Sequence, residues 1–453
     1  MSDILDYQVD HLLLLVGSNP LPNAVAGKLL VTAEGTITLI HSQNSHSLAG
    51  RLKGWLCDAG FSRDRIGCTS VAESDADSVY SNVFSALKAH ENKQGNTNKA
   101  DVARVGLNYT GGTKVMSVHA YRAVEKWAQE RHWEAVFSYL DAHTLRMHID
   151  SPASSRYVGR GVDLSIKDLL TLHDWEISTD PLREPALPES AAALLAIHSN
   201  PDDAKIWVEW LHHTLFPKAR HRVRIDPPIW ISKSDQEVQE QLEQSLGDWK
   251  RDSPLRKLTI TWPDLPKLRE TMSNELGQVG AEDFTLTAGT GPGPGLCTNE
   301  KAFGKWLSGT WLESAVLSVL QDCSEKLQIK ECCMDLLPKL PGVSKGFQFD
   351  VVAIRGYQLF AFSCTTEDGE KRGGRELLKQ KLFEVYIRAR QMGGDEACAA
   401  LICCAEQEMV DGLEQEVRRD MSLENRIRIF GRNHLANLSG HIEKWICEQS
   451  KEG

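Results

Sequence analysis

Carboxylate and hydroxyl side chains recur at predicted strand and helix ends through the stretch 309–405 of this 453-residue chain. Glu313 lies in an apolar helical pattern, and Asp350 opens the apolar run VVAI. Alternation along a predicted hairpin with its turn at Arg355-Gly356 puts Ser363 near the end of the neighbouring strand. The pattern therefore gathers polar groups at one sheet edge. Carboxylate oxygens are the ligands that hard Mg²⁺ or Mn²⁺ prefers, and such an ion activates water for attack on phosphorus.

The motifs in this stretch follow the order GTWLE, FDVVA, LFAFSCTT, KQKLFE and RARQMGG. This order resembles the PD-(D/E)xK nuclease domain of CRISPR-associated nucleases, whose N-terminal half is a CARF (CRISPR-associated Rossmann-fold) sensor. The resemblance implies that Glu313 on a helix and Asp350 at a strand start hold Mg²⁺ or Mn²⁺. The motif's second-strand pair, an acid or serine and then a lysine, falls on Ser363 and Thr365. Taken alone, Glu313 or Asp350 is typical of a solvated cap or edge charge; the ordered set carries the argument.

Thr365 departs from the motif, because a threonine cannot supply the positive charge that stabilises a phosphorane and orients the nucleophile. Lys379 and Lys381 lie on the predicted helix that follows and are candidates for a migrated lysine. Lys381 shares a helix face with Glu384 and Arg388, whereas Lys379 points away from that face, so Lys381 is preferred. The alternative is a catalytically degenerate nuclease fold that binds a nucleotide or nucleic acid without cleavage.

Four elements must position these side chains: a helix carrying Glu313, a strand entered at 347–350, a second strand at 358–363 and a helix over about 375–392. Cations cluster beside the predicted site, and they are Arg372, Arg375, Lys379, Lys381, Arg388 and Arg390. They could line a nucleic-acid cleft or form an ordinary solvated helix face. The sequence does not distinguish DNA from RNA as the substrate.

The N-terminal part alternates strand and helix patterns. The run HLLLLV at 11–16 is typical of a strand buried on both faces of a parallel sheet, and further strands and helices follow from GTITLIHS at 35–42. This pattern predicts a doubly wound, Rossmann-like sheet. The predicted fold class is therefore α/β, with a Rossmann-like N-terminal domain, a mixed connector and a restriction-endonuclease-like C-terminal domain.

Two loops lie at the carboxyl ends of predicted strands, where open α/β sheets bind ligands. They are Gly17 to Pro20, and the segment NYTGGTK, which opens a helix whose N-terminal amides suit a phosphate. Neither has the GxxxxGK[ST] or GxGxxG spacing, which disfavours ATPase and NAD-dependent functions. Such glycine turns also serve as plain connections. The loops resemble the CARF sensor, which implies a cyclic oligoadenylate bound across the two-fold axis of a homodimer, with contacts from Ser18, Asn19, Thr113 and Lys114.

Length and composition predict two or three domains, placed at 1–150, 151–300 and 301–453. The formal charge of −11 disfavours broad binding to duplex DNA, so a nuclease would need a local basic cleft. Eleven scattered cysteines favour reduced thiols. No apolar run is long enough to span a bilayer and the N-terminus is acidic, so we expect a cytoplasmic protein without a membrane anchor.

The middle of the chain is the least informative. ESAAALLAIH and DDAKIWVEWLHHTLF predict amphipathic helices, and DQEVQEQLEQSLGDW continues the helical pattern. The glycine- and proline-rich run at 289–295 predicts a flexible hinge. The role of residues 180–300 stays open.

Overall fold

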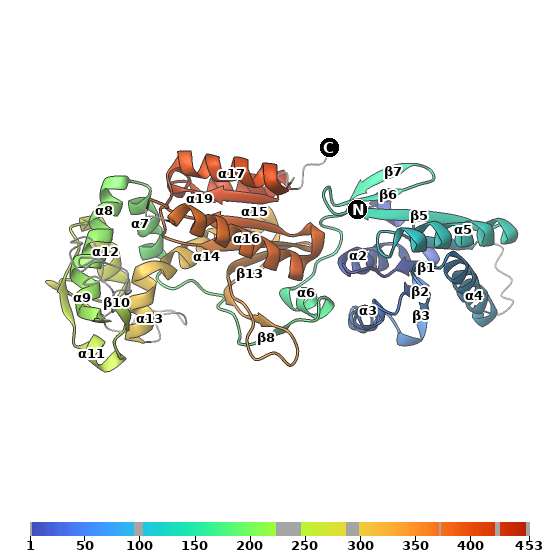
Figure 1. Ribbon diagram of the computed structural model, residues 1–453, viewed down its shortest axis with the longest axis horizontal. Coiled ribbons are helices and arrows are strands. Elements are labelled where there is room, and N and C mark those ends of the chain that lie inside the picture. Colours follow the sequence, from blue (N-terminus) through green and yellow to red (C-terminus); the bar gives the residue numbers. More distant parts are fainter. Residues whose placement is uncertain are drawn as a thin grey trace, which may run out of the picture.

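The computed structural model describes residues 2–94, 103–222, 246–286, 299–370, 373–421 and 426–449. Two principal sheets lie one after the other along the long axis, and a mostly helical segment forms the end beyond the second sheet (Figure 1). The protein is α/β, as predicted. The strand order in the first sheet is β3-β2-β1-β4-β5-β6-β7, and in the second sheet β13-β15-β16-β17-β18.

The first sheet has a parallel core of five strands, to which an antiparallel pair is added at one edge. The strands are β1 (Val9–Leu15), β2 (Val31–His41), β3 (Ile66–Ser70), β4 (Arg104–Asn108), β5 (Glu134–Asp141), β6 (Arg146–Ile149) and β7 (Ser154–Tyr157). Its helices are α1 (Ser2–Leu5), α2 (Leu21–Leu29), α3 (His46–Asp58), the 3-10 turn η1 (Arg63–Arg65), α4 (Ala76–Gln94) and α5 (Lys114–Arg131).

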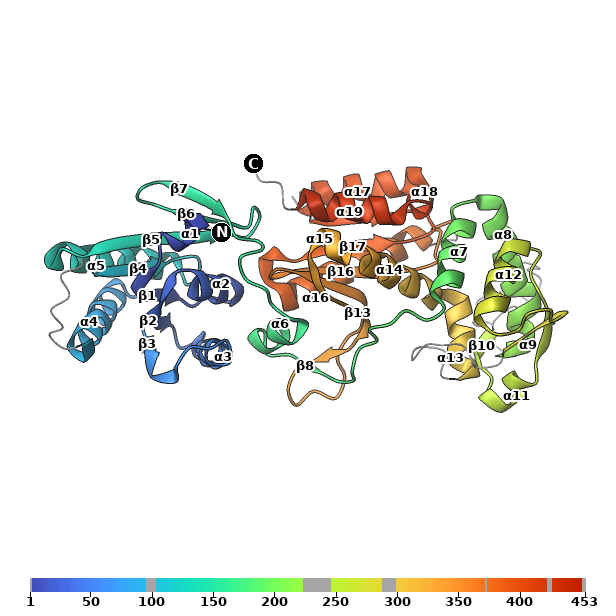
Figure 2. The same ribbon diagram turned by 180° about the vertical axis from the view of Figure 1, so that it is seen from behind.

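Strand β1 explains why this sheet is covered on both faces. Leu12 and Leu14 belong to the core that includes α2 and α3, whereas Leu13 and Leu15 belong to the core that includes α4 and α5. Alternate apolar side chains of one strand therefore bury both helix layers, as the run HLLLLV predicts (Figure 2). Because β1 pairs with β2 on one side and β4 on the other, the loops after β1 and β4 meet at the point where the strand order reverses.

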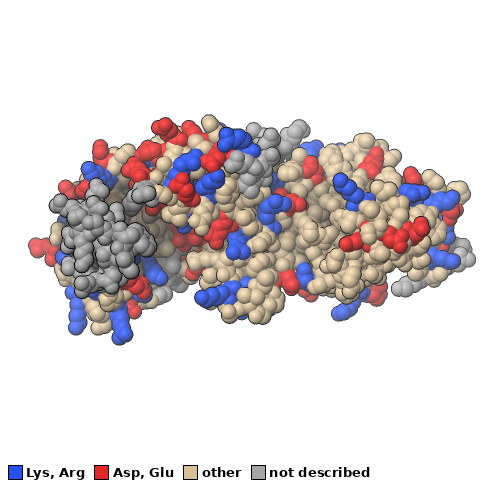
Figure 3. Space-filling view, in the orientation of Figure 1, with Lys and Arg blue, Asp and Glu red and all other residues tan. Residues whose placement is uncertain are grey.

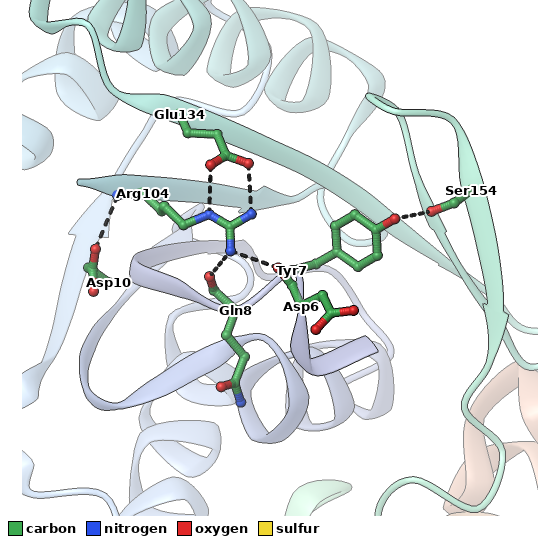
Figure 4. Close-up of polar contacts among 7 residues, drawn as sticks. All are labelled: Asp6, Tyr7, Gln8, Asp10, Arg104, Glu134 and Ser154. Carbon is green, nitrogen blue, oxygen red and sulfur yellow. Dashed lines mark hydrogen bonds and ion pairs between the residues drawn. The ribbon is translucent and has the colours of Figure 1, made fainter. Parts of the chain in front are cut away.

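Arg104 ties the N-terminal segment to the edge of this sheet (Figure 4). Its guanidinium donates to the carbonyls of Asp6 and Gln8 at 2.7 and 2.9 Å, and makes two bonds to the Glu134 carboxylate at 2.7 and 3.0 Å. Its backbone amide donates to Asp10 Oδ2 at 3.1 Å. One arginine thus joins the residues before β1 to β4 and β5.

The second sheet carries the hairpin that the sequence predicts. Its strands are β13 (Ile329–Leu336), β15 (Phe349–Arg355), β16 (Gln358–Cys364), β17 (Cys398–Ile402) and β18 (Ile427–Phe430). On one face lie α16 (Gly374–Gly393) and α17 (Gln407–Met421), and on the other lie α14 (Trp311–Asp322) and α19 (Leu438–Glu448). The first of these helices matches the prediction over 375–392, and the 3-10 turn η4 (Gly394–Glu396) links it to β17.

The remaining elements connect the sheets or form the helical end. Between the sheets lie α6 (Ile166–Leu172) and β8 (Glu176–Ile177), which pairs with β14 (Pro338–Lys339). The others are α7 (Pro188–His198), α8 (Pro201–Trp210), the π-helical turn η2 (Leu211–Leu215), α9 (Phe216–Ala219), β9 (Arg220–Arg222), β10 (Leu246–Trp249), α11 (Asp252–Arg256), β11 (Thr259–Thr261), α12 (Pro266–Glu275), β12 (Asp283–Thr285), α13 (Glu300–Lys305), the π-helical turn η3 (Trp306–Thr310), α15 (Ser324–Leu327) and α18 (Arg432–Leu435).

One helix prediction was wrong where it can be checked. Leu246–Trp249, the end of the pattern DQEVQEQLEQSLGDW, forms strand β10 because it pairs with β9; most of that pattern and the predicted hinge at 289–295 lie outside the described residues. The first sheet continues to Tyr157, a little beyond the predicted boundary at 150, and the three-domain division stays a prediction. Among the described helices none is both long and apolar enough to cross a bilayer.

Candidate functional site

Asp350 lies where two antiparallel strands bring polar groups to one sheet end. It occupies the start of β15, and the hairpin places the end of β16 beside it. Asp350 Oδ2 accepts hydrogen bonds from Ser363 Oγ at 3.1 Å and from the backbone amide of Cys364 at 2.7 Å. The register therefore brings Asp350 and Ser363 together, with the carboxylate fixed by two donors.

Glu313 reaches the same place from α14 and is only 9% exposed. Burial raises its pKa well above the ordinary range, and the nearby charges of Asp350 and Asp335 raise it further, while Lys381 opposes the shift. The pKa of Asp350 is also raised, chiefly by burial; the bonds from Cys364 and Ser363 and the charge of Lys381 oppose this, and Glu384 adds to it. A carboxylate whose pKa is raised by burial and by a neighbouring acid favours binding a proton or a cation.

Asp335 is a site residue that the sequence reasoning missed. Met334 pairs with Val351 and Leu336 with Phe349, so the antiparallel register sets Asp335 opposite Asp350. Its φ of 57° is a left-handed conformation that non-glycine residues adopt rarely. Burial, and then Asp350, raise the pKa of Asp335. A lone aspartate within the apolar strand run CCMDLL was the available signal.

The two candidate lysines of α16 have different surroundings. Lys381 lies near enough to lower the pKa of both Glu313 and Asp350. Lys379 instead forms an ion pair with Glu416 on α17, and its Nζ lies 5.4 Å from the centre of the Phe383 ring. The structure thus brings Lys381, and not Lys379, to the carboxylates.

Thr365 follows β16 and takes part in a turn. Its backbone amide donates to the carbonyl of Ile402 at 2.9 Å, and its hydroxyl accepts from the amide of Glu367 at 3.3 Å. A groove of about 650 Å³ runs along the neighbouring helix α16, and its lining residues are Glu376, Lys379, Gln380, Phe383, Glu384, Ile387 and Arg388. One of its lining residues, Glu384, also raises the pKa of Asp350.

The predicted cationic cluster is largely neutralised by neighbours. Arg375 and Lys379 pair with Glu416, and Arg390 pairs with Asp395. Arg372 lies outside the described residues. Both signs of charge are interspersed on the face shown in Figure 3. Two acidic side chains, Glu416 and Asp395, thus pair with three of the predicted cations.

The donor set Glu313, Asp335 and Asp350 consists of hard oxygen ligands, which fits Mg²⁺ or Mn²⁺ and not a soft metal. Asp350 raises the pKa of both Glu313 and Asp335, and Asp335 also raises the pKa of Glu313, which indicates negative charge that a cation would relieve. Over the part of the chain that the structure describes, no three acidic, histidine or cysteine side chains already stand in metal-binding geometry. The chemistry of Glu313, Asp335 and Asp350 nevertheless fits a hard divalent cation.

The two predicted ligand loops are in backbone contact at the end of the first sheet. A Cβ on Gly111 would lie 2.1 Å from the Leu15 carbonyl oxygen, and one on Gly17 would lie 2.8 Å from the Gly112 amide. Glycine is therefore needed at both loops for this close approach. Lys114 is exposed in the first turn of α5, beside helix amides that favour an anion.

The other three residues predicted to contact the ligand differ in their exposure and in the hydrogen bonds that their side chains make. Ser18 is exposed. Thr113 Oγ1 caps α5 by accepting from the Met116 amide at 3.2 Å and donates to the Glu73 carbonyl at 2.8 Å. Asn19 Nδ2 donates to Glu396 Oε2 at 2.8 Å. The side-chain amide of Asn19 is therefore hydrogen-bonded to a residue that lies just before strand β17 of the second sheet.

No protein-family model matches this sequence, and no curated protein matches it significantly. Two solved structures resemble it over nearly its full length. Can2 from Sulfobacillus thermosulfidooxidans in complex with cyclic tetra-adenylate has 15% identity and a TM-score of 0.62, covering 98% of each chain. Protein VC1899 from Vibrio cholerae has 13% identity and a TM-score of 0.63, covering 97% of this chain and 98% of that one. At these identities the likeness shows a shared fold.

Proposed function

We propose that this protein is a ligand-controlled, metal-dependent endonuclease that cleaves DNA, RNA or both. The observation that carries the proposal is the buried group of Glu313 and Asp350, with Lys381 beside it, at the end of the β15–β16 hairpin. Buried acids with raised pKa values beside a lysine are typical of a catalytic site. The motif order and the whole-chain fold likeness support a nuclease of the PD-(D/E)xK type.

In this proposal Glu313 and Asp350 hold Mg²⁺ or Mn²⁺, and Asp335 is a further oxygen donor. When bound, the ion supplies an activated water and neutralises charge on the phosphate. Ser363 keeps Asp350 in place through its 3.1 Å hydrogen bond. Lys381 holds positive charge beside the scissile phosphate, the role that Thr365 cannot fill. Phe383 in the groove along α16 offers a ring on which a base of a single strand can stack.

The controlling ligand in this proposal is a cyclic oligoadenylate bound at the joined loops after β1 and β4. Can2 was solved with cyclic tetra-adenylate, which supports this ligand class. Lys114 and the amides of α5 suit its phosphates, and Ser18 is free to contact it. A ligand with two-fold symmetry fits a site shared by two copies, so we propose a homodimer.

The test is to incubate the purified protein with Mn²⁺, a plasmid and single-stranded RNA, with and without cyclic tetra-adenylate. We expect cleavage that requires metal and increases with the adenylate. Glu313→Ala and Asp350→Ala should abolish cleavage while the thermal unfolding temperature shows a folded protein, because a methyl group cannot replace a hard carboxylate ligand. Full activity of either alanine variant would remove the nuclease assignment.

A second candidate function is a degenerate nuclease fold that binds a nucleotide or nucleic acid without cutting it. The location of Thr365 in a turn and the lack of a ready three-ligand cluster among the described side chains favour this candidate. It predicts adenylate binding by calorimetry with no cleavage of either substrate under any metal. Metal-dependent cleavage that Asp350→Ala abolishes would exclude it.

A further inference from the structure

The loop after β1 is held by a buried carboxylate from the distant segment η4. Asn19 Nδ2 donates to Glu396 Oε2 at 2.8 Å across a separation of 377 residues. A Cβ on Gly394 would lie 2.5 Å from Asn19 Oδ1, so the backbone of η4 packs directly on the Asn19 amide. Glu396 is 0% exposed. A buried carboxylate is unfavourable unless it is hydrogen-bonded, so Asn19 offsets part of the cost of burying it.

A second contact fixes the same segment to the first sheet. Arg426 donates to the Glu396 carbonyl, and its other terminal nitrogen donates to the carbonyl of Ala142 and, at 2.9 Å, to that of His143. Ala142 and His143 lie in the turn between β5 and β6. Arg426 is 4% exposed, so this bridge is buried as well. The segment η4 therefore contacts the loop after β1 directly, and Arg426 links it to the β5–β6 turn.

The segment also adjoins the two elements that carry the candidate catalytic groups. It follows α16, a 20-residue helix roughly 30 Å long that carries Lys381 in its first half. It precedes β17, whose Leu401 pairs with Ser363 of β16. Residues of α16 and β17 belong to one close-packed core. A displacement of η4 should therefore shift both elements, because such a core does not absorb the change within η4.

We infer that Glu396 is a positioning residue that holds Asn19 in the loop after β1 and couples ligand binding at that loop to α16 and β17. The inference rests on the proposed function and deepens its regulation. An anionic ligand draws the Asn19 amide hydrogens toward its phosphate oxygens, in competition with Glu396. The Glu396 side-chain oxygen that loses this donor stays buried without its hydrogen bond, which drives η4, and with it Lys381, to a new position.

Hydrogen exchange on the full-length protein tests this coupling. Addition of cyclic tetra-adenylate should change amide exchange in residues 391–398 of the unmodified protein. Glu396→Ala should remove that change and lower the ratio of cleavage rates with and without ligand by about tenfold, a usual size for allosteric coupling. Glu396→Gln keeps an acceptor for Asn19 and should restore both. Asp395→Asn, which alters the neighbouring exposed carboxylate, is the matched control and should behave as the unmodified protein.

The outcomes separate this inference from the proposed function. No adenylate binding to the unmodified protein by calorimetry overturns the proposed sensor and the inference together. Binding and activation with unchanged exchange in 391–398 overturns the coupling alone, and so does an alanine variant that remains fully ligand-controlled. If Glu396→Ala does not fold, the coupling is tested by hydrogen exchange in the unmodified protein and in Glu396→Gln. The absence of a ligand-dependent change in residues 391–398 of both would overturn it.

Discussion

At the scale of single residues, Lys379 and Lys381 show how two similar side chains differ in electrostatic surroundings. Lys379 is paired with Glu416, whereas Lys381 acts on Glu313 and Asp350. Lys381→Met should lower the cleavage rate by about a hundredfold or more, because it removes a fixed positive charge beside the phosphate. Single-turnover rates at saturating Mn²⁺ measure this effect.

Lys379→Met is the matched control for that lysine variant, and we expect a loss of less than about threefold because Lys379 is paired with Glu416 on α17 and not with the site carboxylates. Equal losses in the two variants would show only a general need for positive charge near the nucleic acid. No loss in either would favour the non-cleaving candidate function.

At the scale of elements, the N-terminus of α5 combines three features that suit a phosphate. Thr113 caps the helix, Gly111 packs the loop against β1, and Lys114 is exposed in the first turn. Lys114→Ala should weaken binding of cyclic tetra-adenylate by roughly 1–3 kcal/mol, the size of one charge-assisted contact. Calorimetry measures the change, and Lys126→Ala at the far end of the same helix is the control. Unchanged affinity in Lys114→Ala would show that the ligand does not bind at the N-terminus of this helix.

At the scale of the whole molecule, buried histidines set the response of stability to acid. Burial lowers the pKa of His173 from its ordinary 6.5 to about 4, and its Nε2 has no partner among the described residues. The unfolded chain therefore binds the proton first, so this contribution to stability is lost as the pH falls from about 6.5 toward 4. His173→Gln should make the loss between pH 7 and pH 5 smaller by about 2 kcal/mol.

Urea unfolding at pH 7, 6 and 5 measures this difference. His213→Gln, which changes an exposed histidine, is the control and should lose stability with acid as the unmodified protein does. An identical acid response in all three proteins would contradict the role given to His173.

The sequence by itself determined the elements whose patterns are local. Alternation and helical spacing give β1, the β15–β16 hairpin and α16, because these signals repeat within a few residues. The doubly wound order then places the two loops at one sheet end, and the structure confirms their contact. Asp350 and Ser363 could be predicted together because both belong to the β15–β16 hairpin, and Glu313 because the helical pattern of α14 is local as well.

Only the tertiary structure decided which distant groups meet. The register between β13 and β15 places Asp335 opposite Asp350, and no local pattern specifies this register. The left-handed φ of Asp335 also interrupts the regular strand geometry on which alternation depends. Asn19 forms a hydrogen bond with Glu396, which lies 377 residues away in the sequence. Leu246–Trp249 forms a strand because β9 offers an edge, against its helical pattern. In each case the physical reason is the same: pairing and burial between segments far apart in the chain outweigh local preference.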